Sequence, residues 1–388
     1  MSHHVPCYRR VPISFTHGEG CRLFGDDGRS YLDFLTGIGV NALGHAHPGL
    51  TEALREQLGQ LVHISNLYHH PQQEELAARL TEACGLDLVF FCNSGTEAIE
   101  AGIKAARLTQ AKRGHAARTG VLALEKSFHG RTLGALSCTW EASYREPFAP
   151  LMPGVDFVAP NDIAALETAL ASERYAVLMM EPIQGESGVL PLDPAYLEDA
   201  KSLAEGSGTL LLFDEIQSGG GRTGHFLASQ SVGVVPDIVT LAKAIGAGLP
   251  IGATVFRREV GETLQPGTHG STFAGGGLAC RAGNYFLDQL FRDGLLDRVR
   301  SLGERLRRGL EQLCAQHTCA DSFRGMGLMQ ALVLNVQSAP IGTALLERGL
   351  LVNATAGNVL RFLPPFVLTE QELDEGLALI DAELANHD

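Results

Sequence analysis

A lysine that follows a short apolar run is the residue of this sequence best suited to covalent chemistry. Lys243 comes after the run at residues 238–241 and is followed by small and apolar residues. Burial among such residues disfavours the charged ammonium and lowers the pKa of the amine. A Schiff base or a general base requires an amine in that state. Lys243 is therefore a candidate catalytic residue.

A carboxylate closes another apolar run earlier in the chain. Asp214 follows the run at residues 210–213, and Gln217 comes three positions later. A buried carboxylate is costly unless a cation or hydrogen-bond donors compensate it. One interpretation is a Mg²⁺ site, which the lack of a GxxxxGK[ST] motif disfavours. The other is an acid that pairs with a protonated ring nitrogen of a ligand.

Two further segments could hold an anion and a flat ring. Gly95 and Thr96 open a predicted helix directly after an apolar run. Free backbone N–H groups and the helix dipole favour an anion there, although an ordinary helix cap is the structural alternative. Phe128 and Arg131 follow the next run. They combine an aromatic face with a guanidinium suited to a carboxylate, and their structural alternative is a core phenylalanine and an ion pair.

One cofactor requires all of these features together. Pyridoxal phosphate (PLP) needs a Schiff-base lysine and an acid beside its ring nitrogen. It also needs an aromatic neighbour and an anion site, so the combination predicts a PLP enzyme. A dinucleotide site is not predicted, because the glycine spacing at residues 246–252 is wrong and Pro250 blocks the required helix.

The predicted strands place these residues at one edge of a sheet. Short apolar runs alternate with stretches of helical period from residue 86 onward. Strands are predicted at residues 86–92, 120–124, 155–158, 176–180, 210–213 and 238–241, and helices at 97–108, 163–171 and 194–205. This pattern indicates an α/β fold with a mostly parallel sheet and helices on both faces. Ligands of such sheets bind at the carboxyl ends of the strands.

The two ends of the chain have a different pattern. Strand-like pieces lie at residues 21–24 and 31–34, and the tail holds two long helical stretches, further strands and a final helix. We therefore expect a large PLP-binding domain at residues 46–274. The N- and C-terminal segments, 1–45 and 275–388, are expected to form a smaller α+β domain.

Charge and hydropathy exclude several classes of partner. The net charge is −14, from 30 Lys+Arg and 44 Asp+Glu, with no basic block. Nucleic acids and anionic membranes attract clustered positive charge, so neither is expected as a partner. No apolar run approaches the roughly 20 residues that cross a bilayer. The start of the chain lacks the apolar region of a signal peptide, which favours a cytoplasmic location.

The sequence resembles class III (fold-type I) PLP aminotransferases over nearly its whole length. The motifs that carry the resemblance lie at residues 32–34, 44–48, 65–68, 181–186, 243, 270–273 and 358–362. Within this class it is most similar to the acetylornithine aminotransferases of arginine biosynthesis. The resemblance implies transfer of the δ-amino group of N²-acetylornithine to 2-oxoglutarate, which gives N-acetylglutamate 5-semialdehyde and glutamate.

Other activities stay open at this point. The amino donor could instead be succinylornithine, ornithine, 4-aminobutyrate or succinyl-diaminopimelate. The resemblance also implies that ornithine aminotransferases usually carry a tyrosine where this chain has Ile38, which favours an acylated substrate. From other classes, an NAD-dependent oxidoreductase and a non-catalytic binding protein are the alternatives.

The resemblance also implies roles for cofactor-binding residues. Lys243 would carry PLP and move the proton, while Asp214 would keep the ring nitrogen protonated. Phe128 would stack on the ring, and Gln217 would lie near its phenolic oxygen. Gly95 and Thr96 would hold the phosphate, with Ser271 and Thr272 supplied by the neighbouring subunit of a homodimer with shared active sites.

The expected substrate-binding residues are Arg131, Ser271, Glu186 and Arg361. By the same resemblance, Arg131 binds the substrate carboxylate remote from the reacting amine. Arg361 binds the α-carboxylate of glutamate, and Glu186 pairs with Arg361 when acetylornithine occupies the site. A simple ion pair without this switch is the alternative. No metal site is expected, and the histidines at 45, 47, 69 and 70 are predicted to be structural.

Overall fold

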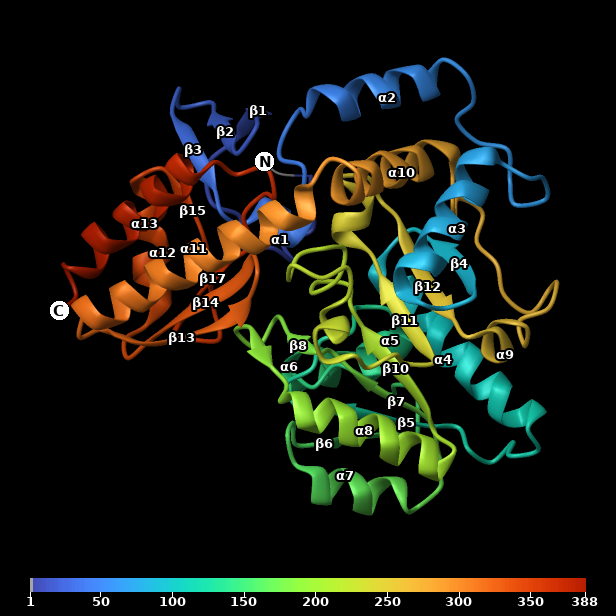
Figure 1. Ribbon diagram of the computed structural model, residues 1–388. Coiled ribbons are helices and arrows are strands. Elements are labelled where there is room, and N and C mark those ends of the chain that lie inside the picture. Colours follow the sequence, from blue (N-terminus) through green and yellow to red (C-terminus); the bar gives the residue numbers. More distant parts are fainter. Residues whose placement is uncertain (1–2) are drawn as a thin grey trace.

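The computed structural model describes residues 3–388, and its centre is a seven-stranded sheet (Figure 1). The strand order is β4-β12-β11-β10-β7-β5-β6. The strands are β4 Leu88–Cys92, β5 Gly120–Leu124, β6 Val155–Val158, β7 Tyr175–Met180, β10 Leu210–Asp214, β11 Ile238–Leu241 and β12 Gly252–Phe256. The α/β fold with a mostly parallel sheet is thereby confirmed.

One strand of this sheet was not predicted. Strand β12 lies between β11 and β4 and runs antiparallel to both. Its sequence is Gly-Ala-Thr-Val-Phe. The glycine and the threonine make its apolar run weaker than those of the neighbouring strands. The predicted strand at 86–92 begins at Leu88 instead, and the other predicted strands lie within one residue of their observed limits.

Helices cover both faces of the sheet, as the alternation of apolar runs and helical stretches predicts. Helix α4 (Gly95–Lys112) packs on one face, and α7 (Ile163–Leu170) and α8 (Pro194–Ser207) pack on the other. Alternate residues of β10 supply the two cores: Leu212 packs with α4, whereas Leu211 and Phe213 pack with α8. A central strand that is buried on both faces fixes the position of the residues at its end.

The remaining helices surround this core and the smaller sheets. The longer ones are α2 Pro48–Leu58, α3 Pro71–Cys84, α10 Gly277–Phe291, α11 Leu295–Gln316, α12 Ser338–Glu347 and α13 Glu370–Leu384. The short ones are α1 Thr36–Gly39, α5 Leu133–Ser137, α6 Ala142–Arg145 and α9 Arg258–Gly261, with 3₁₀ turns at Glu146–Phe148, Ala228–Val232 and Lys243–Gly246. Among residues 3–388 no helix is both long and apolar enough to cross a membrane.

Three smaller sheets lie outside the central one. The first has the order β1-β2-β3-β15, with β1 Phe15–Glu19, β2 Arg22–Gly25, β3 Ser30–Asp33 and β15 Leu350–Leu351. The second has the order β13-β14-β17-β16, with β13 Ala320–Met326, β14 Met329–Leu334, β16 Asn353–Thr355 and β17 Val359–Phe362. A two-stranded hairpin joins β8 (Ile183–Gln184) to β9 (Leu190–Pro191).

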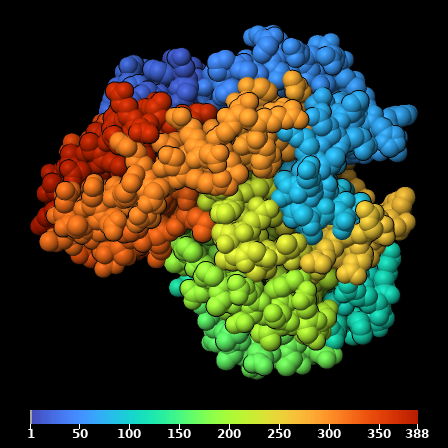
Figure 2. Space-filling view, viewed as in Figure 1, coloured from blue at the N-terminus to red at the C-terminus, as the bar shows by residue number. Residues whose placement is uncertain are grey.

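We propose the domain division expected above, with residues 46–274 as the large domain. Parallel pairing of β15 with β3 supports it, because this pairing joins the two ends of the chain in one sheet. In the space-filling view the C-terminal residues gather in one lobe, with N-terminal residues along its upper side (Figure 2). Helix α10 lies at the boundary, where it packs against α2 and α3. Residues 1 and 2 lie outside the described part of the chain.

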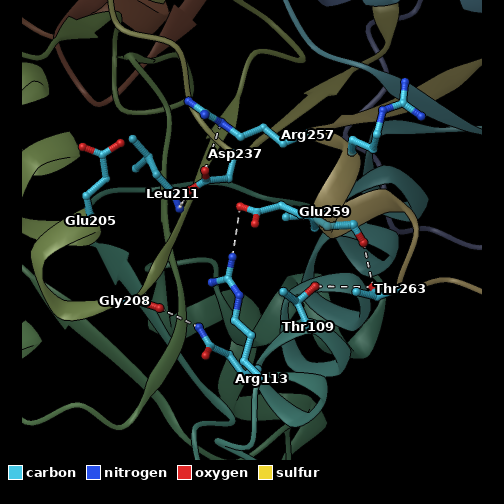
Figure 3. Close-up of polar contacts among 12 residues, drawn as sticks. Thr109, Arg113, Glu205, Gly208, Leu211, Asp237, Arg257, Glu259 and Thr263 are labelled. Atoms are coloured by element: carbon cyan, nitrogen blue, oxygen red, sulfur yellow. Dashed lines mark hydrogen bonds and ion pairs between the residues drawn. The ribbon is translucent and has the colours of Figure 1, made fainter.

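Polar contacts fasten the amino ends of the central strands, opposite the edge that carries the candidate site (Figure 3). Asp237, directly before β11, accepts a hydrogen bond from the backbone N–H of Leu211 in β10 (2.8 Å) and pairs with Arg257 (3.1 Å). Arg113, directly after α4, pairs with Glu259 of α9 (3.0 Å). These contacts hold strands and helices in register at this end.

Candidate active site

The predicted site residues gather around a cavity at the carboxyl ends of the central strands. Its volume is about 450 Å³. Eight of the predicted residues line it, namely Gly95, Thr96, Phe128, Arg131, Glu186, Asp214, Gln217 and Lys243. They come from the ends of β4, β5, β10 and β11 and from the β8–β9 hairpin. Arg361 lies directly behind this wall, where it contacts Glu186 and Gln217.

Lys243 is half-buried at the cavity wall, and its amine has no partner among the described residues. In the described chain its amine forms no hydrogen bond and no ion pair within 4.0 Å. Burial lowers the pKa of Lys243, although the carboxylates of Glu186 and Asp214 oppose the shift. Its backbone φ is 48°, a left-handed conformation that is costly for a residue other than glycine. The fold therefore holds a reactive amine in a strained position that directs it into the cavity.

Asp214 is buried at the end of β10 and is held from three sides. Its carboxylate accepts hydrogen bonds from His129 Nδ1 (2.8 Å), the backbone N–H of Ile216 (3.1 Å) and the hydroxyl of Thr240 (3.3 Å). His129 had no predicted role, although it lies beside Phe128 in the motif at residues 128–131. The carboxylate is thus fixed in one orientation at the cavity wall, where it can face a protonated ring nitrogen.

The first turn of α4 is the predicted anion site. Ser94 caps the helix through its hydroxyl, which accepts the backbone N–H of Glu97 (3.4 Å). The backbone of Gly95 and Thr96 lines the cavity. A Cβ atom added to Gly95 would lie 2.7 Å from Cδ1 of Ile216, so a larger residue there would force the Ile216 side chain to shift. The cap that the sequence offers as the structural alternative is therefore present, and the anion site at the same helix start stays a prediction.

A second glycine brings a neighbouring loop close to this turn. Gly130 has φ 136°, and a Cβ there would lie 2.3 Å from Oγ1 of Thr96. Thr96 Oγ1 accepts the backbone N–H groups of Arg131 and Thr132, each at 3.2 Å. The loop that carries Phe128 and Arg131 is therefore hydrogen-bonded directly to Thr96 at the predicted anion site.

Arg131 is held by aromatic rings rather than by an acid. Its guanidinium carbon lies 3.7 Å from the ring centroid of Tyr144 and 5.6 Å from that of Phe128. No ion pair of Arg131 is formed within the described residues, so the structural ion pair considered above is not present. An oriented, unpaired guanidinium at a cavity wall is suited to a carboxylate ligand.

Arg361 and Glu186 form an ion pair at the cavity wall. The Nη1 atom of Arg361 lies 2.7 Å from Glu186 Oε1 and 3.1 Å from Gln217 Oε1. Asn353, which had no predicted role, accepts hydrogen bonds from Nε (3.1 Å) and Nη2 (2.7 Å). Burial opposes the ionisation of Glu186, but the Arg361 pair lowers its pKa below the ordinary value.

Ser271 and Thr272 do not line the cavity of their own chain. Thr272 is exposed, and Ser271 Oγ accepts a hydrogen bond from Asn93 Nδ2 (3.1 Å). Both border a separate surface pocket. Their predicted contribution to the active site of a neighbouring subunit stays a prediction.

The four predicted histidines have structural contacts. His47 and His70 cap α2 and α3 by accepting backbone N–H groups. His45 pairs with Asp33 (2.8 Å), and His69 pairs with Glu74 (2.9 Å). Within residues 3–388 no group of three or more His, Cys, Asp or Glu side chains is placed to hold a metal ion.

Comparison with known proteins assigns the family. The model of the family "Aminotransferase class-III" matches residues 6–384. The chain belongs to the class III aminotransferases. An acetylornithine aminotransferase of Caldanaerobacter subterraneus is 43% identical to this class III aminotransferase, over 97% of this chain and 96% of the relative.

Solved structures of class III aminotransferases share the fold over nearly the whole chain. An ornithine aminotransferase from Toxoplasma gondii has a TM-score of 0.95 at 33% identity and covers 99% of this chain and 93% of its own. An N-acetylornithine aminotransferase from Stenotrophomonas maltophilia has a TM-score of 0.86 at 34% identity. The match covers 98% of this chain and 97% of that structure's chain.

PLP is the cofactor of class III aminotransferases, and the site fits it. The cavity combines an unpaired amine, a fixed buried carboxylate and an anion-ready helix start. The two glycines leave room that a Cβ atom would fill. The protein is therefore a PLP-dependent transaminase, and its substrates are small molecules of the amino-acid and 2-oxo-acid classes.

Proposed function

We propose that the protein transfers the δ-amino group of N²-acetylornithine to 2-oxoglutarate. The products are N-acetylglutamate 5-semialdehyde and glutamate. The observation that carries the proposal is the ion pair of Arg361 with Glu186 (2.7 Å), which borders the cavity that holds Lys243. The relative from Caldanaerobacter and the Stenotrophomonas structure, both acetylornithine aminotransferases, support the choice of substrate.

In this proposal the residues that line the cavity hold PLP. Lys243 binds it covalently, and Asp214 keeps the ring nitrogen protonated with the support of His129. The first turn of α4, with Gly95 and Thr96, receives the phosphate. Phe128 and Gln217 also line the cavity, where Phe128 would lie against the ring and Gln217 near its phenolic oxygen. When bound, PLP withdraws electrons from the carbon that bears the reacting amine.

Lys243 then moves the proton. Once the amine of the substrate has replaced Lys243 on the cofactor, the amine of Lys243 would be free. Its lowered pKa favours the neutral form, which would accept a proton from the substrate carbon. Lys243 would then return that proton to the cofactor carbon.

The two arginines bind different carboxylates. Arg131 has no ion-pair partner among the described residues. It receives the carboxylate that lies farther from the reacting centre, which is the amine of acetylornithine or the keto carbon of 2-oxoglutarate. Acetylornithine presents only a methylene toward Arg361, so the guanidinium stays paired with Glu186. Glutamate and 2-oxoglutarate present a carboxylate there, which takes the place of Glu186. One site thus accepts two substrates in turn.

The test is a transamination assay with purified enzyme. We expect conversion of N²-acetylornithine and 2-oxoglutarate to the semialdehyde and glutamate, with ping-pong kinetics. The comparison is the kcat/KM for succinylornithine, ornithine, 4-aminobutyrate and succinyl-diaminopimelate. A kcat/KM for any of these four amines above that for N²-acetylornithine would reject the proposal.

Free ornithine is the second candidate substrate, because the Toxoplasma ornithine aminotransferase has the TM-score of 0.95. Ile38 argues against it. This side chain is apolar and exposed; it does not itself line the cavity but lies two residues before Val40, which does. An apolar residue offers no hydrogen bond to the free α-ammonium of ornithine. The ratio of kcat/KM for acetylornithine and ornithine decides between the two.

We also propose a homodimer with shared active sites. Leu67, Tyr68 and Phe273 are exposed large side chains in the loops beside Thr272. Covering them with a second copy would bring Ser271 and Thr272 toward another chain. The molar mass in solution and the effect of Thr272→Val on PLP affinity test this proposal. The cytoplasmic location stays a prediction.

A further inference from the structure

Glu100 is a carboxylate near the predicted anion site that has no part in the chemistry described so far. It lies on α4, one turn after Thr96. One of its oxygens, Oε1, accepts three hydrogen bonds. The donors are the hydroxyl of Thr132 (2.6 Å) and the backbone N–H groups of Gly134 (3.0 Å) and Ala135 (3.1 Å). Glu100 therefore binds both a side chain and the backbone at the start of α5.

The hydroxyl of Thr132 has only one proton, and that proton points to Glu100. The hydroxyl oxygens of Thr132 and Thr96 lie 2.8 Å apart, so one of them donates to the other. Because the Thr132 proton is already used for the carboxylate, Thr96 must be the donor of this pair. The hydrogen bonds thus run in one direction, from Thr96 to Thr132 and from Thr132 to Glu100.

The hydroxyl of Thr96 is then fully engaged. Its proton goes to Thr132, and its oxygen accepts the backbone N–H groups of Arg131 and Thr132, each at 3.2 Å. A hydroxyl offers one proton and two acceptor positions, and all three are in use. A phosphate at this helix start would therefore meet the backbone N–H of Thr96 rather than its hydroxyl, which is committed to the loop of Arg131.

This loop decides where the guanidinium of Arg131 lies. Apart from the rings of Tyr144 and Phe128, the described chain provides no partner for the guanidinium. No acid holds its far end, so its position depends on its backbone. Thr96 accepts the N–H of that backbone, and the close approach of the two segments is possible because Gly130 has no Cβ atom.

We propose that Glu100 and Thr132 are positioning residues for Arg131. They fix the direction of the Thr96 hydroxyl, which in turn holds the backbone N–H of Arg131 and so sets the point from which the guanidinium reaches the substrate carboxylate. Neither Glu100 nor Thr132 lines the catalytic cavity. This role rests on the function proposed above, in which Arg131 binds that carboxylate.

The experiment measures how much the enzyme gains from the α-carboxylate of the amino donor. N²-acetylornithine is compared with N-acetylputrescine, which has the same chain and acetyl group but lacks this carboxylate. With purified holoenzyme we expect kcat/KM for acetylornithine to be higher by about 100-fold or more, because the carboxylate forms charge-assisted hydrogen bonds with Arg131. A general loss of stability or of cofactor lowers both kcat/KM values equally and leaves their ratio unchanged.

Variants at the two ends of the network then test the positioning. Thr132→Val removes the hydroxyl at nearly constant volume, and we expect the ratio to fall by about tenfold, since a small displacement of a binding group is costly. Thr132→Ser should restore most of it. Glu100→Ala should give a similar fall, whereas Glu100→Gln, whose amide oxygen can accept the same bonds, should keep part of the ratio.

Thr168→Val is the matched control. Thr168 is an exposed threonine of α7 that does not line the cavity, and its hydroxyl donates to a helix carbonyl. We expect this variant to keep the wild-type ratio.

The outcomes separate this proposal from the proposed function. A wild-type ratio well above one that survives Thr132→Val or Glu100→Ala overturns the positioning role and leaves the proposed function in place. An equal loss of kcat/KM for both substrates does the same. A wild-type ratio near one rejects the binding of the carboxylate by Arg131, and inactivity on acetylornithine rejects the proposed function, and the positioning role falls with either. Because the two variants change separate residues, one of them that folds is sufficient for the test.

Discussion

The Nδ1 atom of His129 lies 2.8 Å from Oδ2 of Asp214, and both side chains are buried. The histidine comes from the loop after β5 and the aspartate from the end of β10. With Nδ1 as the donor, the imidazole orients a carboxylate that would otherwise rest on Thr240 and one backbone N–H. The Nε2 atom of His129 is buried without a partner in the described chain. His129 therefore acts as a positioning residue that orients the carboxylate of Asp214.

His129→Leu should weaken the cofactor site without removing a group that contacts substrate. Loss of one hydrogen bond to a charged group costs about 1.5–3 kcal/mol. We expect PLP affinity or kcat to fall by about tenfold or more, and His129→Gln to restore part of it. Titration of the apoenzyme with PLP and the steady-state rate measure the effect. A Leu variant with wild-type values of both would contradict this role for His129.

Lys243→Ala should abolish transamination. Without this amine, no group of the chain replaces the proton acceptor and covalent anchor, so a loss of about 10³-fold or more is expected. The absorbance of bound PLP should change at the same time. The measurement is the single-turnover rate with acetylornithine, alongside the visible spectrum. A loss of less than tenfold would show that another residue accepts the proton.

Glu186→Gln should change the two half-reactions in opposite directions. Removal of the carboxylate leaves the Arg361 guanidinium without its 2.7 Å anionic partner. We expect KM to fall for glutamate and to rise for acetylornithine, each by about tenfold. Glu198→Gln, an exposed carboxylate on α8, is the control. If both KM values of Glu186→Gln move in the same direction, the ion pair does not act as a switch.

Glu181 makes stability depend on pH. Burial raises its pKa to about 7 from an ordinary 4.5, although the backbone N–H groups of Phe128 and Gly185 favour the carboxylate. Between these values the native protein holds a proton that the unfolded chain has released. The contribution of Glu181 to the free energy of unfolding therefore falls as pH rises through this window, by about 1–3 kcal/mol.

Glu181→Gln removes this contribution. We expect the unfolding temperature of the variant, relative to wild type, to be higher at pH 8 than at pH 5. Other titrating groups are common to both proteins and cancel in this comparison. Thermal unfolding of the holoenzymes at the two pH values gives the result. A difference with the opposite sign would mean that Glu181 is ionised in the native state at pH 5.

Gly130→Ala should damage the anion site. The added Cβ would lie 2.3 Å from Oγ1 of Thr96, at a φ of 136°. We expect a cost of about 1–3 kcal/mol in stability and weaker PLP binding. Gly114→Ala is the matched control, because Gly114 also has a positive φ (86°) but no atom within 4 Å of the added Cβ. It should lose only about 1 kcal/mol and bind PLP normally. If Gly130→Ala and Gly114→Ala lose the same stability and the same PLP affinity, the loss comes from the backbone conformation and not from the contact with Thr96.

Local patterns predicted most of the central sheet, because a strand buried on both faces has to be a continuous apolar run. β10 and β11 illustrate this: both were predicted within one residue of their limits, and Asp214 and Lys243 were found from their positions at the ends of those runs. β12 was missed, since Gly252 and Thr254 interrupt its apolar character. Its antiparallel direction depends on pairing with β11 and β4, which no local period encodes.

By itself the sequence determined the chemistry that is available: an amine and an acid after apolar runs, a helix start for an anion, and two arginines. Tertiary structure decided which groups meet. Glu186 and Arg361 are 175 residues apart, and His129 and Asp214 are 85 apart. Such pairs form only when the order of the strands and the closure of the loops bring distant segments together. The local sequence indicates whether a residue follows a buried strand or begins a helix. The tertiary fold determines which distant side chain it contacts.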